Sequence, residues 1–221
     1  MTDKLDPTQN SAIAILAYGF RPFFFLAGVH GAVALLLWLA IQVDALSAPG
    51  HWPGATWHGH EMLFGYAPAV LAGFLLTAVP NWIGVPPLRH FTLAALVALW
   101  LAGRAAVALA GYLPELLVTI IDAAFLPTVM LLLLPPLIAH RKWRNVIFVV
   151  PLSALTVTNL ALHFSVAGEL GVLPRDAFIV ATGLFALLIT VMGGRIIPSF
   201  TANVLRGRGG DPGMRNYAPL N

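Results

Sequence analysis

The sequence predicts an all-α membrane protein, a bundle of about six transmembrane helices with both termini in the cytoplasm. Three observations lead to this fold class: an apolar composition, six long apolar stretches, and an uneven distribution of basic residues between loops. Of the 221 residues, 59% are hydrophobic and only 10% are charged, and the mean hydropathy is +0.85. A soluble domain carries about 25% charged residues, so soluble and disordered classes are excluded. Backbone polar groups in lipid must be paired internally, which requires helices.

A bilayer core about 30 Å thick requires about 20 apolar residues per helix. Six segments meet this requirement: 22–43, 60–82, 91–111, 114–139, 145–166 and 176–197. The first is longer than the apolar core of a secretory signal and begins late, so we expect it to remain as a span. We therefore divide the chain into an N-terminal tail (1–21), a six-span transmembrane domain (22–197) and a C-terminal tail (198–221) that we expect to be partly disordered.

The basic residues predict the orientation. The two tails and alternate loops carry nine of the twelve Lys and Arg: Lys4, Arg21, Arg89, Arg141, Lys142, Arg144, Arg206, Arg208 and Arg215. The remaining loops carry only Arg175. Because Lys and Arg accumulate in cytoplasmic loops, both tails are predicted to be cytoplasmic, and the loop 44–59 to face the periplasm or the cell exterior.

Several classes of chemistry are excluded by absence. The chain has no cysteine, which rules out disulfides, thiolate metal sites and thiol catalysis. It has no Gly-rich phosphate loop, no nucleophile elbow and no HExxH motif. The basic residues form short loop clusters without interleaved aromatics, so we expect no nucleic-acid partner.

Ionisable side chains inside spans cost free energy and mark functional sites by default. They are His30, Glu61, Arg104, Asp122, His163 and Arg195, accompanied by Asn81 and Asn159. The densest group, Trp57-His58-Gly59-His60-Glu61-Met62, opens the second span. On a continuous helix, residues two apart point about 200° apart. His58 and His60 could therefore share one metal only if His58 lies in an extended approach to the helix.

Glu61 begins a stripe of small residues with Gly65, Ala69 and Gly73, which predicts that it faces the bundle interior. Thr156, Asn159 and His163 form a matching polar stripe on the fifth span, with His163 at the same outer level. Arg104 joins this level, and Asp122 lies somewhat deeper.

Histidines, carboxylates and an arginine at similar depth indicate one site. Imidazole suits haem iron or copper where thiolates are missing. Glu61 or Asn159 could fix an imidazole tautomer, and Arg104 could neutralise a haem propionate or pair with Asp122.

Ordinary structural roles compete with this hypothesis. A lone histidine within a span is more often a packing residue, and we interpret His30 in this way. His51 and His90 are loop positions without an expected partner, and Arg104–Asp122 can be a purely structural ion pair. We expect most tryptophans to be interfacial anchors near span ends: Trp38, Trp52, Trp57, Trp82 and Trp143.

Several motifs resemble the NnrS family of bacterial inner-membrane proteins. They are Gly19-Phe20-Arg21-Pro22-Phe23-Phe24, Trp57-His58-Gly59-His60-Glu61-Met62-Leu63-Phe64-Gly65, Gly73-Phe74-Leu75-Leu76-Thr77-Ala78-Val79-Pro80-Asn81-Trp82, Asn159-Leu160-Ala161-Leu162-His163, and Gly194-Arg195-Ile196-Ile197-Pro198-Ser199-Phe200-Thr201. The resemblance covers about residues 18–205 and is most specific at the WHGHEM block.

The resemblance implies a multi-pass protein of the bacterial inner membrane that contains haem and copper and is linked to nitric oxide, nitrosative stress and denitrification. His58, His60 and His163 are then the first candidate metal ligands. Glu61, Asn159 and Arg104 support the cofactor, and Asp122 and Arg195 are further polar pathway or structural residues. Members of the family are usually about twice as long, so we expect a homodimer or a missing second half.

Two other hypotheses remain open. Glu61, Arg104 and Asp122 within the membrane also suit half of a transporter or proton-coupled permease. The chain could also be a fragment without independent activity. Its expected partners are the lipid bilayer and nitric oxide, and we assign it no enzymatic reaction.

Overall fold

The computed structural model of the protein describes residues 14–141 and 148–207, and these residues form helices, turns and loops with no strand. The helices are α2 (Phe20–Gln42), α3 (Gly54–His60), η1 (Glu61–Tyr66), α4 (Ala67–Ile83), α5 (His90–Ala108), α6 (Glu115–Ala123), α7 (Phe125–Ala139), α9 (Val149–Val166) and α10 (Pro174–Gly207). The chain divides within α10 into two compact units, the first ending at Ala181 and the second beginning at Thr182.

Within the described residues, six helical segments are long and apolar enough to cross a membrane: Phe20–Gln42, Gly54–Ile83, His90–Ala108, Glu115–Ala139, Val149–Val166 and Pro174–Gly207. The predicted all-α class with six membrane-spanning helices is therefore confirmed. The boundaries agree with the prediction within a few residues, with two larger differences. The second span begins at Gly54 instead of residue 60, and the last helix continues beyond residue 197 to Gly207. The predicted disorder of residues 208–221 lies outside the described residues.

The helix ends follow the local sequence. Pro53 and Pro114 have extended backbones and lie directly before α3 and α6. Proline suits the entry to a helix but not its interior, so both helices begin after these residues. Gly84 ends α4 with φ 75°, a left-handed conformation that glycine adopts without strain. Pro127 cannot donate to the carbonyl of Ala123, which explains the break between α6 and α7 at Ala124.

The second span contains a π-helical turn, η1, between two α-helical parts. It ends two residues before Pro68, which has no N–H to donate to the carbonyl of Phe64. Such π-turns are rare and occur often at functional sites. Here the turn begins at the carboxylate that the sequence placed in the bundle interior, Glu61, which is 3% exposed.

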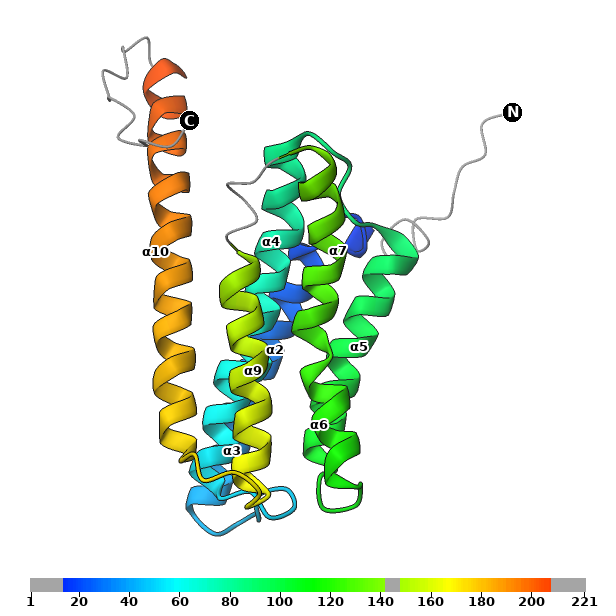
Figure 1. The fold of residues 1–221 in the computed structure, drawn as a ribbon, viewed down its shortest axis with the longest axis vertical. Helices are drawn as coiled ribbons and strands as arrows, with labels where there is room; N and C mark the ends of the chain where they lie inside the picture. Colours follow the sequence, from blue (N-terminus) through cyan, green and yellow to red (C-terminus); the bar gives the residue numbers. More distant parts are fainter. Residues whose placement is uncertain (1–13, 142–147, 208–221) are drawn as a thin grey trace. The chain divides into compact units, whose positions relative to one another are not determined.

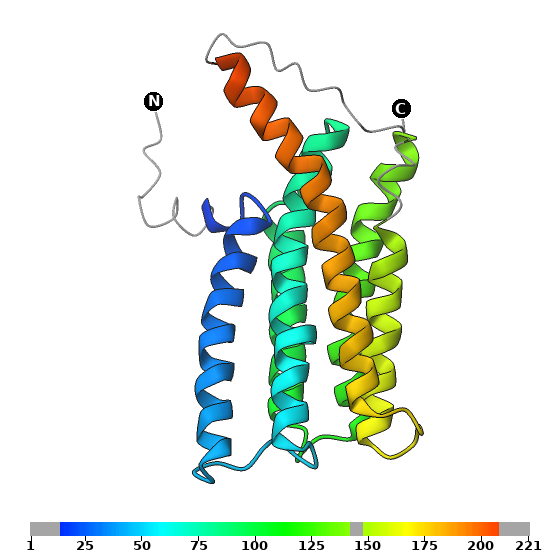
Figure 2. The same cartoon turned by 90° about the vertical axis from the view of Figure 1, so that its left-hand side faces the viewer.

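Within the first unit, α2 packs along α4, and α7 packs against both α4 and α9 (Figure 1). The approach of α2 to α4 depends on Gly73, where a Cβ would lie 2.9 Å from the ring of Phe24. Figure 2 shows α2 running alongside the second span. The outward side of α2 is apolar and exposed, for example at Phe25 and Leu36, as expected of a lipid-facing surface.

Candidate metal centre

Six side chains from four spans meet in what we call the buried polar cluster. Its members are His60 at the end of α3, Glu61 in η1, Arg104 on α5, Asp122 on α6, and Asn159 and His163 on α9. His60 is 0% exposed, and the two carboxylate residues and Asn159 are at most 4% exposed. The structure thus brings together six of the predicted site residues.

One carboxylate oxygen lies at the centre of the cluster. Asp122 Oδ2 lies 3.1 Å from His60 Nε2, 2.9 Å from His163 Nε2 and 2.8 Å from Asn159 Nδ2, which donates a hydrogen bond to it. Asn159 Oδ1 lies 3.2 Å from the same Nε2 of His60. Two imidazole nitrogens, one from α3 and one from α9, therefore face a single carboxylate oxygen.

His60 is held at both ring nitrogens. Its Nδ1 lies 3.1 Å from Glu61 Oε1, and a carboxylate can only accept a hydrogen bond. When Nδ1 donates to Glu61, Nε2 of the neutral ring carries a lone pair. That lone pair faces Asp122 Oδ2 and Asn159 Oδ1, which also have lone pairs. A cation at this position would relieve the repulsion, and carboxylate partners of this kind orient histidine ligands in metal sites.

Arg104 joins the two carboxylates. Its Nη1 donates to Glu61 Oε1 at 2.9 Å, and its Nη2 forms an ion pair with Asp122 Oδ1. Glu61 Oε2 is in turn 3.0 Å from His30 Nε2. Gly65 leaves the room for this arrangement, because a Cβ there would lie 2.6 Å from Arg104 Nη1 and 2.7 Å from His30 Nε2.

His60, Asp122 and His163 can hold a metal ion. Each offers one ligand atom, and all three atoms lie within 4.8 Å of one another. Ligands about 2.0–2.1 Å from a tetrahedral metal are about 3.3–3.4 Å apart. The two nitrogen-to-oxygen distances in the cluster, 3.1 and 2.9 Å, are close to that spacing. Small side-chain shifts would therefore accommodate an ion.

The charges also favour a cation. With neutral imidazoles, Glu61 and Asp122 contribute two negative charges and Arg104 one positive charge, which leaves the cluster with a net charge of −1. An unbalanced charge in a buried site is costly unless it is neutralised. A bound cation would supply the missing positive charge.

Trp52 closes the cluster on one side. Its ring contacts those of His60 and His163, with centroid distances of 4.9 and 5.3 Å, and it is only 5% exposed. Trp57 is also buried, at 4%. The expectation that these two tryptophans are interfacial anchors is therefore wrong: Trp52, in the loop before α3, packs against the histidines of the cluster, and Trp57 is buried on α3 itself.

Two predicted site residues lie outside the cluster. His58 belongs to helix α3, so it points away from His60 and stacks on Trp38 with a centroid distance of 4.4 Å. The extended approach that would have brought both histidines to one metal does not occur. Arg195 lies on α10 beyond Ala181 and belongs to the second unit.

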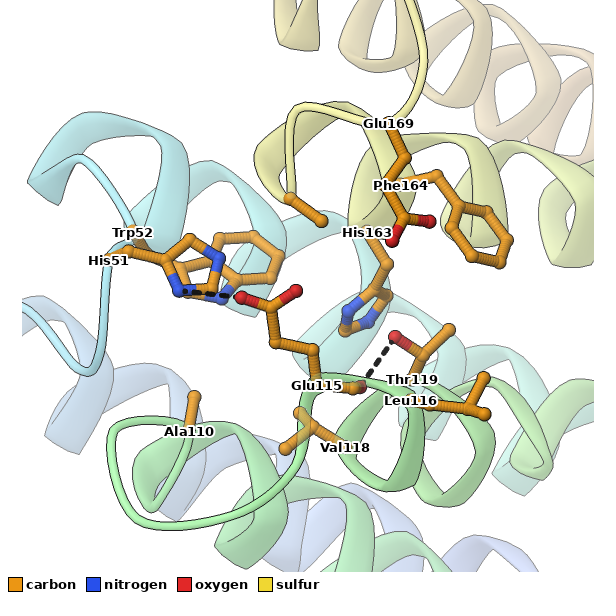
Figure 3. A pocket seen from close by; sticks show the side chains of 11 residues that line it. His51, Trp52, Ala110, Glu115, Leu116, Val118, Thr119, His163, Phe164 and Glu169 are labelled. Carbon is orange, nitrogen blue, oxygen red and sulfur yellow. Dashed lines mark hydrogen bonds and ion pairs between the residues drawn. The ribbon is translucent and has the colours of Figure 1, made fainter.

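Next to the cluster lies a cavity of about 210 Å³, which we call the outer pocket (Figure 3). It is lined by His51, Trp52, Ala110, Glu115, Leu116, Val118, Thr119, His163, Phe164, Ala167 and Glu169. His163 is the residue shared by the pocket and the metal-ligand set. Cavities that enclose drug-sized ligands measure about 300–1,000 Å³, so the outer pocket is too small for a haem. The residues present fit a single ion better than a macrocycle.

Three residues of the cluster surroundings and the outer pocket were not predicted from the sequence. His30, which we interpreted as a packing residue, contacts Glu61. His51, for which no partner was expected, lies 3.3 Å from Glu115. The third is Trp52. His51 and Trp52 sit in a long loop, whose path the sequence pattern does not determine. For His30, its position within an apolar span was the available signal.

Comparison with known proteins agrees with the motifs. No curated protein and no solved structure matches the chain. The profile of one family, described as NnrS protein, matches residues 14–220, which is nearly the whole chain and includes every residue of the buried polar cluster. The chain is thus a member of the NnrS family.

Proposed function

We propose that this protein binds a single metal ion, with copper as the first candidate, through His60, Asp122 and His163. The observation that carries the proposal is the convergence of two imidazole nitrogens on one buried carboxylate oxygen. Imidazole suits zinc, copper, iron and nickel, and among these the family resemblance points to copper. Glu61 orients His60, Asn159 holds Asp122, and Arg104 limits the charge of the two carboxylates.

We further propose that the metal-loaded protein acts in the response to nitric oxide, as the NnrS resemblance implies. A bound metal would supply a ligation position for the gas. Nitric oxide is small and dissolves in lipid, so it can reach a buried site without an aqueous channel. The residues of the cluster keep the ligands in place and exclude bulk water, since His60 is completely buried and Trp52 covers both rings.

The test is a comparison of metal content in purified variants. His60→Ala and His163→Ala should lose the metal, because each removes one of three ligands. His58→Ala is the matched control: it removes a neighbouring histidine of the same motif, which stacks on Trp38 outside the cluster. Equal metal content in all three variants would contradict the proposal.

Haem, which the resemblance also implies, is tested in the same samples by absorption spectroscopy. The packing of His60 and His163 against each other, with ring centroids 5.2 Å apart, leaves no space for a porphyrin between them. A haem band that disappears in both His60→Ala and His163→Ala would therefore overturn the mononuclear site.

A further inference from the structure

The outer pocket has a chemical character of its own. It lies at the end of the bundle formed by the loops before α3, between α5 and α6, and after α9. Its formally charged lining residues are Glu115 and Glu169, and no Lys or Arg from the described part of the chain lines it. A cleft lined by charges of one sign concentrates ions of the opposite sign, so this pocket favours cations over anions.

The pocket also reaches the buried polar cluster through one residue. Figure 3 shows the imidazole of His163 pointing from α9 into the space beside Glu115 and Thr119. The Nε2 of that ring contacts Asp122 Oδ2 at 2.9 Å. Trp52 forms part of the pocket wall and contacts the rings of both His163 and His60. His163, itself a metal ligand, and Trp52 therefore separate the cavity from the other two ligands, His60 and Asp122.

The mouth of the pocket holds a second histidine–carboxylate pair. His51 Nδ1 lies 3.3 Å from Glu115 Oε1, and the two side chains are 42% and 53% exposed. They come from the loop before α3 and from the first residue of α6. This pair is accessible, unlike the cluster, and imidazole and carboxylate are both ligand groups for divalent metal ions.

From these observations we propose that the outer pocket is a cation-selective entry port, through which a hydrated metal ion passes from Glu115 and His51 to His163 and the buried cluster. The inference rests on the proposed metal site for its destination. The cation selectivity of the pocket does not depend on that site, and can be measured separately.

The first experiment needs no metal. The chain contains no cysteine, so Thr119→Cys places a single thiol in the pocket wall. We expect a small cationic methanethiosulfonate to modify this thiol faster than an anionic reagent of similar size. Adding Glu115→Gln should reduce the ratio of the two rates by about threefold or more, as expected for the loss of one partly exposed charge. Val118→Cys places a thiol elsewhere on the same wall. It repeats the measurement should the change at Thr119 disturb the local structure.

Ile120→Cys is the matched control, since Ile120 is the next residue of α6, is 57% exposed and does not line the pocket. Its thiol should resist both water-soluble reagents in membranes. Two results would overturn the entry port: pocket thiols that neither reagent modifies, and a cation-to-anion rate ratio that Glu115→Gln leaves unchanged.

The second experiment follows the loading of metal-free protein with Cu²⁺. Glu115→Gln should slow loading by about threefold or more and leave the final metal content unchanged, because the cluster ligands are intact. His163→Ala should abolish binding. Wild-type loading rates in Glu115→Gln would refute the port and leave the metal site standing. Full binding by His163→Ala would refute the metal site and the destination of the port, but not the cation selectivity measured in the first experiment.

Discussion

Arg104→Gln is the most informative perturbation of the buried polar cluster. Arg104 forms ion pairs with both Glu61 and Asp122, whose side chains are 4% and 0% exposed. Without it, the net charge of the cluster changes from −1 to −2, with neutral imidazoles. Removing one partner of a buried pair typically costs about 3–5 kcal/mol. We therefore expect the free energy of unfolding in detergent to fall by about that amount.

A double-mutant cycle separates this charge effect from lost packing. Glu61→Gln combined with Arg104→Gln restores a net charge of −1, so the double variant should be more stable than the sum of the single changes predicts. The expected coupling exceeds about 0.5 kcal/mol. Arg175→Gln, at an exposed position, is the control and should leave stability nearly unchanged. Additive effects of Glu61→Gln and Arg104→Gln would refute the electrostatic account of the cluster.

Two further variants test the packing around the cluster. Gly65→Ala should destabilise the protein and weaken metal binding, because the new Cβ would displace Arg104 and His30. Gly28→Ala is the control and should be tolerated, because nothing lies within 4 Å of the added atom. Thermal unfolding compares the two, and equal stability would contradict the close approach. Trp52→Ala should cost about 3–5 kcal/mol and speed the exchange of bound metal with a chelator, since it uncovers His60 and His163. Unchanged exchange would show that Trp52 does not shield the site.

Much of the fold was predictable because membrane spans follow from local composition. Burial of Glu61 was also predictable, because its stripe with Gly65 and Gly73 marks one helix face. Asn159 and His163 share a face of α9 by their spacing, and both reach the cluster. In each case the spacing of residues along one helix was sufficient to predict which side chains face the bundle interior.

The remaining features depend on contacts between distant segments. The sequence could not show that His58 is already helical, and this one boundary decides that His58 and His60 point apart. The inward fold of Trp52 and the pairing of His51 with Glu115 depend on the path of a loop. Helical periodicity contains no information about such a path.

The central claim is that two histidines and one carboxylate hold a single metal ion. Extended X-ray absorption fine structure of the metal-loaded protein measures this most directly. We expect the scattering of two imidazole rings, with a carboxylate oxygen, at about 2.0–2.2 Å from the metal, and the loss of one ring in His163→Ala. A spectrum with the four equivalent nitrogens of a porphyrin, or one that is the same in wild type and His163→Ala, would contradict the site.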